Sequence, residues 1–310
     1  MSGSLLAYVL AGLLAQLVDG SLGMGFGVSA NTVLVSTGVA PAAASATVHV
    51  AKIGTAVSSG ASHWRYGNVS WPLVLRLGLP GAIGAFAGAN FLSSVDSAWV
   101  ESAVALVLCG LGIVVVLRAT RGDLDHHEAS GKPPHRLGFL ASLGLGGGFL
   151  DAIGGGGWGP VTTPTLLAGG RIAPRTVVGS VSLAELIVAI AATGGFVTGL
   201  GRDGVDLWMA LALVTGGAIA APFAARLVGK ASPARLGAGV GALLLVVNIR
   251  TLLLAADVAG PTRLAVLTTL VVAGSALTWW VGRPQAVEPA PADDDTDPGG
   301  EMVLAPADGT

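Results

Sequence analysis

The sequence is poor in cysteine, in charge and in aromatic side chains. Cys109 is the only cysteine among 310 residues, which excludes an intrachain disulfide, and its apolar surroundings predict a small buried side chain. Charged residues make up 11% of the chain and aromatic residues 5%, whereas soluble domains carry about 25% charged residues. Hydrophobic residues reach 52%, and the mean hydropathy is +0.75. This composition excludes an ordinary soluble domain and is typical of a membrane protein.

Basic segments are missing at both ends. No basic region precedes a short apolar run and cleavage site at the N-terminus, so we expect no removable signal peptide. Seven acidic residues and no basic residue follow Arg283. Without that tail, 16 basic residues face 18 − 7 = 11 acidic ones, which gives the membrane body a net charge of +5. The tail, 284–310, is expected to be disordered and acidic.

Long apolar segments are abundant, and they divide the chain. They lie near 5–37, 41–62, 71–92, 99–118, 137–168, 174–199, 205–228, 236–256 and 264–282. A crossing helix needs about 20 residues, so the first and fifth segments are too long for a simple crossing. Each contains a glycine cluster, which predicts either a strongly tilted helix or a broken hairpin.

The two halves of the chain resemble each other. "DGSLGMGFG" (19–27) aligns with "DAIGGGGWG" (151–159), 132 positions later. "APAAASATVHVAK" (40–52) then aligns with "APRTVVGSVSLAE" (173–185), and "GAIGAFAGA" (81–89) with "GAIAAPFAA" (217–225). Three matches in the same order indicate an internal repeat, which is a feature of membrane transporters.

Basic residues favour an inverted arrangement of these repeats. If both long segments are hairpins, ten basic loop residues share one face and only Arg202 and Arg263 lie opposite, as the positive-inside rule expects. The ten are Arg65, Arg118, Arg121, Lys132, Arg136, Arg171, Arg175, Arg226, Lys230 and Arg235. A hairpin followed by three crossings inverts the second half, and the N-terminus is then expected outside.

We therefore predict an all-α polytopic membrane protein, multi-pass in the cell (inner or plasma) membrane. Its expected parts are a first transmembrane repeat (1–118), a polar loop (119–136), a second repeat (137–256), an additional C-terminal helix (257–283) and the tail (284–310). Each repeat is expected to begin with a glycine-broken hairpin, followed by three transmembrane helices.

The glycine clusters allow two interpretations. A nucleotide-binding loop is excluded because the required strand is missing, as is the Lys-Ser/Thr of a P-loop. The glycines could simply let helices pack closely. Alternatively, they unwind the chain near the bilayer midplane, where half-helix N-termini attract an anion.

Ionisable residues inside apolar segments favour a transport pathway. Ser45, His49 and Lys52 share one face of the second segment, and Glu185 occupies the position that matches Lys52 in the repeat. Lys52 could hold an anion, while Glu185, His49, Asp19 and Asp151 are candidate proton carriers. The alternatives are a structural Lys52–Glu185 ion pair, a His49 helix–helix hydrogen bond, and aspartates that cap the broken backbone.

The arrangement resembles the sulfite exporter TauE/SafE family. The resemblance rests on "LAQLVDGSLGMGFGV", "GFLDAIGGGGWGPVTTPTLL", "GVAPAAASATVHV" and "LPGAIGAFAGA", and it covers roughly residues 5–255. It implies a membrane permease that moves sulfite, sulfonates or other organosulfur anions, commonly by export. The chain departs from the family where Ser29–Thr32 replace the proline that usually follows the first cluster, and in its additional C-terminal segment and acidic tail.

The predicted function is secondary transport of small organosulfur anions, by proton-coupled export with alternating access around a midplane site. An uncoupled anion channel is the main alternative; a membrane enzyme or a scaffold fits less well, and no cofactor, metal or nucleic acid is expected. Homo-oligomerisation is left open. The expected substrate-binding residues are Gly23, Met24, Gly25, Phe26, Gly27, Asn31, Thr32, Ser45, His49, Lys52, Gly155, Gly156, Gly157, Trp158, Gly159, Thr162 and Ser182.

Overall fold

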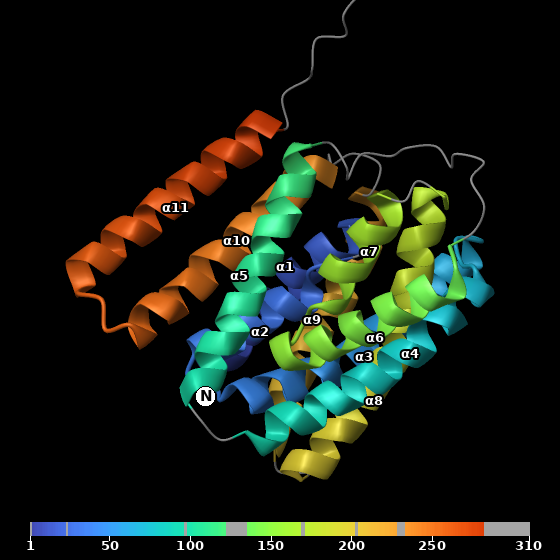
Figure 1. The fold of residues 1–310 in the computed structure, drawn as a ribbon, viewed down its shortest axis with the longest axis horizontal. Coiled ribbons are helices and arrows are strands. Elements are labelled where there is room, and N and C mark those ends of the chain that lie inside the picture. Colours follow the sequence, from blue (N-terminus) through green and yellow to red (C-terminus); the bar gives the residue numbers. More distant parts are fainter. Residues whose placement is uncertain are drawn as a thin grey trace, which may run out of the picture.

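The computed structural model describes residues 2–22, 24–95, 98–121, 135–168, 171–201, 204–227 and 233–281. Over these residues the chain forms eleven α-helices and no β-strand (Figure 1). The helices are α1 (Ser2–Leu22), α2 (Phe26–Ser36), α3 (Pro41–Arg65), α4 (Trp71–Ser94), α5 (Ala98–Thr120), α6 (Leu137–Gly154), α7 (Trp158–Ala168), α8 (Pro174–Leu200), α9 (Leu207–Leu227), α10 (Pro233–Ala255) and α11 (Gly260–Val281). Gly23, the predicted tail and most of the predicted 119–136 loop lie outside the described residues.

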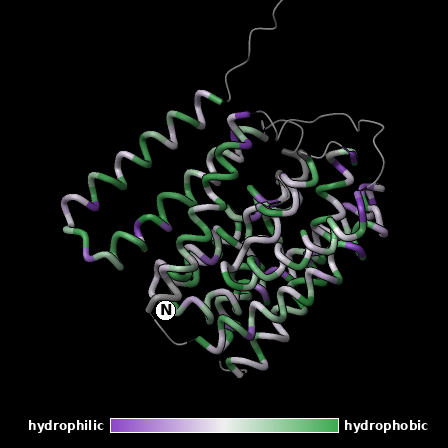
Figure 2. Tube along the Cα trace, in the orientation of Figure 1, coloured by the Kyte–Doolittle hydropathy of each residue, from purple (hydrophilic) through white to green (hydrophobic). Residues whose placement is uncertain are grey.

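The helices have the length and surface of membrane spans. Windows in α4, α6, α8, α10 and α11 are long and apolar enough to cross a bilayer. Apolar residues colour these helices along much of their length (Figure 2). Large apolar side chains such as Leu79 and Ile83 of α4 are exposed on the outer surface, 54% and 66% respectively. The protein is therefore an all-helical, multi-pass membrane protein, because only lipid covers such a surface without cost.

Each of the two long apolar segments is divided at its glycine cluster. Residues 23–25 separate α1 from α2, and residues 155–157 separate α6 from α7. Gly25 has a φ of 119° and Gly155 a φ of 70°, in the left-handed region that favours glycine. The helices end there because these glycines adopt a backbone conformation that an α-helix does not contain.

The chain turns back after each break. The Tyr8 hydroxyl, near the start of α1, lies 3.4 Å from Thr37 Oγ1, just beyond α2. In the second repeat, His135 precedes α6 and Arg171 follows α7; burial, together with the nearby Arg171 guanidinium, lowers the pKa of His135. Both helix pairs thus return toward the face from which they started.

Each broken segment packs against a helix of the other repeat. Helix α1 lies on α9, and α6 lies on α4. A Cβ at Gly12 would overlap the Leu213 carbonyl oxygen, and a Cβ at Gly144 would overlap the Leu77 carbonyl oxygen. Gly12 and Gly144 are 132 positions apart, and Leu77 and Leu213 are 136 positions apart. These are the separations of the aligned motifs 19–27 and 151–159, and 81–89 and 217–225, so the two contacts are related by the repeat. The repeat detected in the sequence therefore also appears in the packing, where glycine allows backbones to touch.

Two hydrogen bonds between the repeats are also related to each other by the repeat. The Asp206 N–H donates to Thr47 Oγ1 (3.2 Å), and the Ser70 N–H donates to Ser180 Oγ (2.9 Å). The first bond places the start of α9 beside α3, and the second places the start of α4 beside α8.

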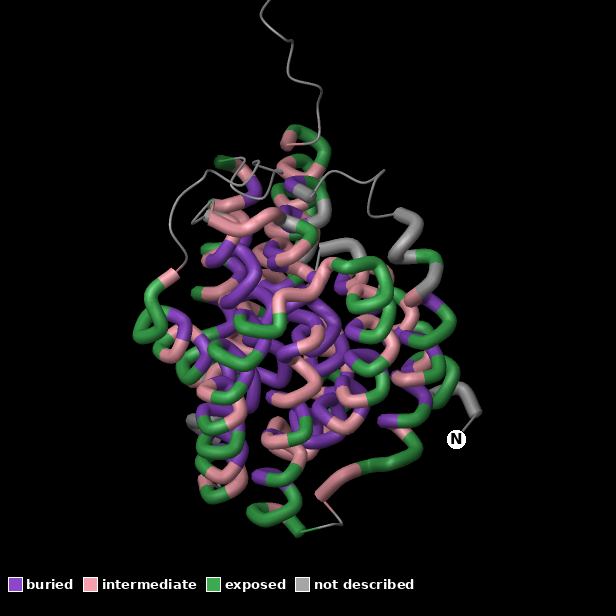
Figure 3. The backbone as a smooth tube through the Cα atoms, turned by 90° about the vertical axis from the view of Figure 1, so that its right-hand side faces the viewer, coloured by how far each residue is buried: buried purple, intermediate pink, exposed green. Residues whose placement is uncertain are grey.

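Helices α3 and α8 occupy the centre of the molecule and run antiparallel. Gly60, near the end of α3, contacts Leu183 near the start of α8. His49, nearer the start of α3, has its ring 5.8 Å from the ring of Phe196 near the end of α8. The buried residues concentrate in the middle of the bundle (Figure 3). Matching helices of the two repeats therefore face each other in the core with opposite directions.

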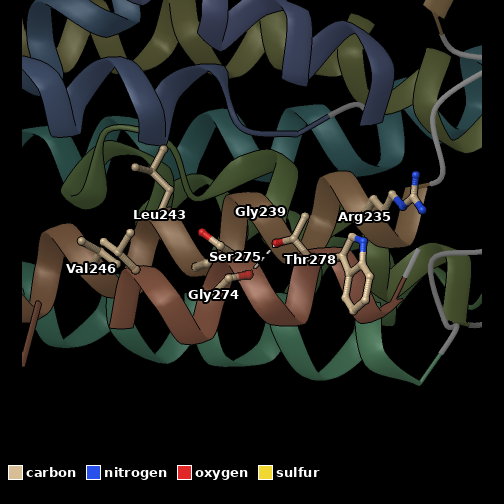
Figure 4. A pocket seen from close by; sticks show the side chains of 10 residues that line it. Arg235, Gly239, Leu243, Val246, Gly274, Ser275 and Thr278 are labelled. Atoms are coloured by element: carbon tan, nitrogen blue, oxygen red, sulfur yellow. Dashed lines mark hydrogen bonds between the residues drawn. The ribbon is translucent and has the colours of Figure 1, made fainter. Parts of the chain in front are cut away.

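Helix α11 lies at the periphery, where it packs along α10 (Figure 1). Between them is a groove of about 750 Å³ with Arg235 toward one end and Val246 toward the other (Figure 4). Within α11 the Thr278 hydroxyl donates to the Gly274 carbonyl (2.7 Å). The groove is mostly apolar, and no ionisable residue of the predicted site lines it, so we place the functional site elsewhere.

Candidate functional site

A buried ion cluster joins the two repeats at the centre of the bundle. Lys52 of α3 has its Nζ 2.8 Å from both carboxylate oxygens of Asp151 in α6 and 2.8 Å from Oε1 of Glu185 in α8. The side chains of Lys52 and Asp151 are 2% and 0% exposed, whereas that of Glu185 is 14% exposed. All three protons of the ammonium group can therefore be used by carboxylate oxygens, as a buried cation requires.

Antiparallel packing explains why Lys52 meets Glu185. The two residues hold matching positions in the repeat, on the matching helices α3 and α8. Because these helices run in opposite directions through the core, matching positions near their middles come opposite each other. The contact is the Lys52–Glu185 ion pair that the sequence allowed as an alternative.

His49 extends the cluster by one turn of α3. Its Nε2 lies 3.1 Å from Asp151 Oδ2, and its Nδ1 lies 2.8 Å from the Ser45 carbonyl oxygen. The Ser45 hydroxyl donates to the Ala152 carbonyl (2.6 Å) and fixes α3 against the end of α6. Nδ1 must carry a hydrogen, because a carbonyl oxygen only accepts.

The geometry of the His49–Asp151 contact restricts which groups can carry a proton. With a hydrogen on Nδ1, a neutral imidazole would present the Nε2 lone pair to a carboxylate oxygen, which is an unfavourable pair of acceptors. A hydrogen bond at 3.1 Å forms only if His49 is an imidazolium or Asp151 is a carboxylic acid.

Both break aspartates cap the helix that follows. The Trp158 N–H donates to Asp151 Oδ1 (2.9 Å), and the Phe26 N–H donates to Asp19 Oδ1 (3.3 Å). A carboxylate at a helix N-terminus satisfies an otherwise unpaired donor and interacts favourably with the helix dipole. The half-helix N-termini, expected to attract a substrate anion, therefore already hold an internal carboxylate.

The two breaks also touch each other. A Cβ at Gly156 would overlap Val28 N, and one at Gly27 would overlap the Gly155 carbonyl oxygen. The Asn31 amide, from α2, donates to the Gly154 carbonyl at the end of α6 (2.9 Å). The expectation that the breaks face each other agrees with this geometry, although they meet by direct backbone contact.

The predicted residues fall into three groups. Ser45, His49, Lys52, Asp151 and Glu185 come together in the cluster. The residues of the two breaks contact one another across the repeats. The remaining described hydroxyls, Thr162 and Ser182, form no hydrogen bond with the side chains of the cluster. Thr162 bonds back to the Trp158 carbonyl (2.6 Å), and Ser182 is buried in α8. Met24, Phe26 and Trp158 fill the core with their side chains, and Gly23 lies outside the described residues.

A polar cavity of about 700 Å³ between α2, α5 and α10 was not foreseen. It contains the predicted Asn31 and Thr32, together with Ser102, Asn248 and Arg250, which sequence reasoning did not assign. An arginine and an asparagine two positions apart in an apolar span were the available signal. Among the described residues, no group of three His, Cys, Asp or Glu side chains could hold a metal ion.

Broken helices that meet at a buried ion cluster between two repeats are the architecture of a membrane transporter. The chain belongs to the sulfite exporter TauE/SafE family, whose model matches residues 8–251. It is 44% identical over 249 residues to the probable membrane transporter protein YtnM of Bacillus subtilis (strain 168), which covers 80% of this chain and 83% of that protein. No solved structure matches the chain. The protein is thus a membrane transporter of a family named for sulfite export, and not an enzyme.

Proposed function

We propose that the protein exports small organosulfur anions, such as sulfite or sulfonates, across the cell membrane in a proton-coupled process. The observation that carries this proposal is the position of Lys52 Nζ, 2.8 Å from the carboxylates of both Asp151 and Glu185. A buried cation held by two carboxylates is a site where protonation of a carboxylate can be coupled to binding of an anion. The family match supports the substrate class.

Competition between the substrate anion and a carboxylate for Lys52 would couple anion transport to proton transport. A substrate anion reaches the ammonium group only if one carboxylate releases it. Glu185 is the more exposed of the two partners, and its release leaves Asp151 in place as the helix cap. Protonation of Glu185 removes its charge, weakens its hold on Lys52, and allows the anion to take its place.

The His49–Asp151 pair would supply the second proton position. The Asp151 carboxylate contacts His49, Lys52 and the Trp158 N–H, so a change in the charge of one partner alters its interactions with the other two. A proton that arrives at His49 can therefore bias the charge balance around Lys52. The cluster is neutral with His49 and Lys52 charged and with Asp151 and Glu185 ionised, which suits a membrane core.

We further propose that the repeats are inverted and that rocking of one against the other alternates access to this cluster. The antiparallel packing of α3 and α8 supports inversion, as do the paired contacts Gly12–Leu213 and Gly144–Leu77. Loops at one end of the bundle, including 65–71 and 171–174, carry basic residues such as Arg65 and Arg171. By the positive-inside rule that end faces the cytoplasm.

The experiment is anion flux in proteoliposomes with sulfite, thiosulfate, sulfoacetate and taurine, in wild type and Lys52→Ala. We expect wild type to move at least one of these anions and Lys52→Ala to lose that flux. Arg65→Gln is the matched control, because it removes an exposed cation from the end of the same helix. Normal transport by Lys52→Ala would refute the assignment of the cluster.

A further inference from the structure

The cavity between α2, α5 and α10 has the properties of a ligand site. Its volume of about 700 Å³ lies within the range of small-molecule pockets, which is about 300–1,000 Å³. Polar residues from all three helices line it: Asn31, Thr32, Ser102, Asn248, Arg250 and Thr251. It opens near the turn that joins α2 to α3, since Gly38, Val39 and Pro41 form part of its wall.

Several of these groups lack a partner within the protein. Asn31 is 3% exposed, yet its Oδ1 forms no hydrogen bond. Among the described residues, the Arg250 guanidinium and the hydroxyls of Thr32 and Ser102 have no hydrogen bond or ion pair. The buried Asn31 oxygen marks a place where a ligand or water completes the bonding, and the exposed Arg250 guanidinium is free to bind a ligand beside it.

The floor of the cavity reaches the second glycine break. Asn31 Nδ2 donates to the Gly154 carbonyl (2.9 Å), and Leu108, another lining residue, contacts Gly154. Gly154 ends α6, three positions after Asp151 in the ion cluster. The wall of the cavity therefore contacts the end of α6, three positions along the chain from Asp151 of the ion cluster.

The charge of the cavity selects its ligand. Among the described residues that line it, Arg250 is the one ionisable side chain, and the cavity opens at the end of the bundle with few basic loop residues. A guanidinium offers a planar fork of donors that matches two oxygens of a sulfite or sulfonate group. The Thr32 and Ser102 hydroxyls can donate to the same oxygens.

From this geometry we infer that the cavity is a second anion site, in which Arg250 holds the oxyanion at the outer mouth of the pathway. The inference rests on the proposed function for its substrate class. The anion passes between this site and Lys52 beside the Asn31–Gly154 contact, at the point where the two repeats touch. The site gives the protein an arginine fork for an oxyanion, which the ion cluster lacks.

This site can be tested by measuring sulfoacetate binding and flux in three variants, Arg250→Gln, Arg250→Lys and Arg263→Gln. A hydrogen bond from a charged group contributes about 1.5–3 kcal/mol, so Arg250→Gln should weaken binding and raise KM by about tenfold to a hundredfold. Arg250→Lys should recover part of the loss. Arg263, outside the cavity near the same end, is the matched control and should leave both values unchanged.

The outcomes separate this inference from the proposed function. If wild type transports sulfoacetate and Arg250→Gln does so with an unchanged KM, the second site is wrong and the function stands. If no anion is transported but binding still depends on Arg250, the site stands and the function is wrong. Binding and transport that are both absent in wild type would overturn both.

A labelling experiment tests the location without removing Arg250. In a Cys109→Ser background, Ser102→Cys places a thiol in the cavity, and Ser94→Cys places one at the exposed end of α4, outside it. A membrane-impermeant maleimide should label both from the outer face, and sulfoacetate should protect only Ser102→Cys. Equal labelling with and without sulfoacetate would overturn the inference.

Discussion

Asp19 and Asp151 hold matching positions in the two repeats, and each carboxylate accepts the N–H of the first residue of the helix after its break. Beyond this cap their surroundings differ. Asp151 also binds Lys52 and His49 and is fully buried, whereas no salt bridge joins Asp19 to another described residue and it is 8% exposed. Both repeats thus restart the helix in the same way, and of the two aspartates only Asp151 forms salt bridges with Lys52 and His49 of the first repeat.

The largest difference is expected between Asp151→Asn and Asp19→Asn. Asparagine retains an oxygen that can accept the helix N–H, so each substitution removes the charge and spares the cap. Breaking a buried ion pair costs about 3–5 kcal/mol, so Asp151→Asn should abolish flux and lower the Tm in detergent. Asp19→Asn should retain most of the flux and most of the thermal stability. Equal losses in the two variants would show that the repeats share the chemistry.

Gly156→Ala tests the contact between the breaks. Its Cβ would overlap the backbone of Gly27 and Val28, which cannot move aside as a side chain can. Overpacking costs about 1–3 kcal/mol, occasionally more, so the unfolding midpoint should fall and flux should decrease. Gly146→Ala is the control, since its Cβ meets nothing within 4 Å. An unchanged midpoint for Gly156→Ala would mean that the breaks lie farther apart.

Asn31→Leu should have a smaller effect on stability. It removes the hydrogen bond to the Gly154 carbonyl, which couples α2 of the first repeat to α6 of the second. A lost hydrogen bond costs about 1 kcal/mol, so thermal unfolding should shift by a few degrees. Because Asn31 also lines the cavity, KM for the anion should rise. Hydrogen exchange that remains slow at residues 154–157 would contradict the coupling.

The smallest difference is expected between His135 and Tyr8, at the corresponding ends of the two helical hairpins. The pKa of His135 is lowered from its ordinary value of 6.5 by burial and by Arg171, so the unfolded chain binds the proton more tightly. Stability should therefore decline slightly as the pH falls below about 6.5. His135→Gln should remove this small dependence. Tyr8→Phe, at the corresponding end of the first hairpin, should leave the pH profile unchanged; a change there would assign the dependence elsewhere.

The sequence predicted the parts of the fold that depend on local chemistry. Glycine clusters mark the breaks because Gly25 and Gly155 adopt positive φ, and the aspartate before each cluster reveals the repeat. The polar stripe through Ser45, His49 and Lys52 follows from helical spacing, and the structure gathers these residues around Asp151.

Contacts that depend on packing between helices could not be predicted in this way. Lys52 and Glu185 align as equivalents, and only the antiparallel arrangement of α3 and α8 turns that equivalence into a 2.8 Å contact. Arg250 and Asn248 belong to no motif, and their role emerges only where α10 meets α2 and α5. By contrast, the capping of both half-helices by Asp19 and Asp151 agrees with the alternative drawn from the sequence.

The most direct test of coupling is uphill flux of sulfoacetate in proteoliposomes under an imposed pH gradient at zero membrane potential. Sulfonates stay ionised, so they do not cross the lipid unaided as a neutral acid does. If protonation of Glu185 releases Lys52, the imposed pH gradient should make wild type concentrate the anion on one side of the membrane, whereas Glu185→Gln should only equilibrate it. Wild-type flux that follows the anion gradient alone, whatever the pH gradient, would contradict proton coupling and leave an uncoupled anion channel.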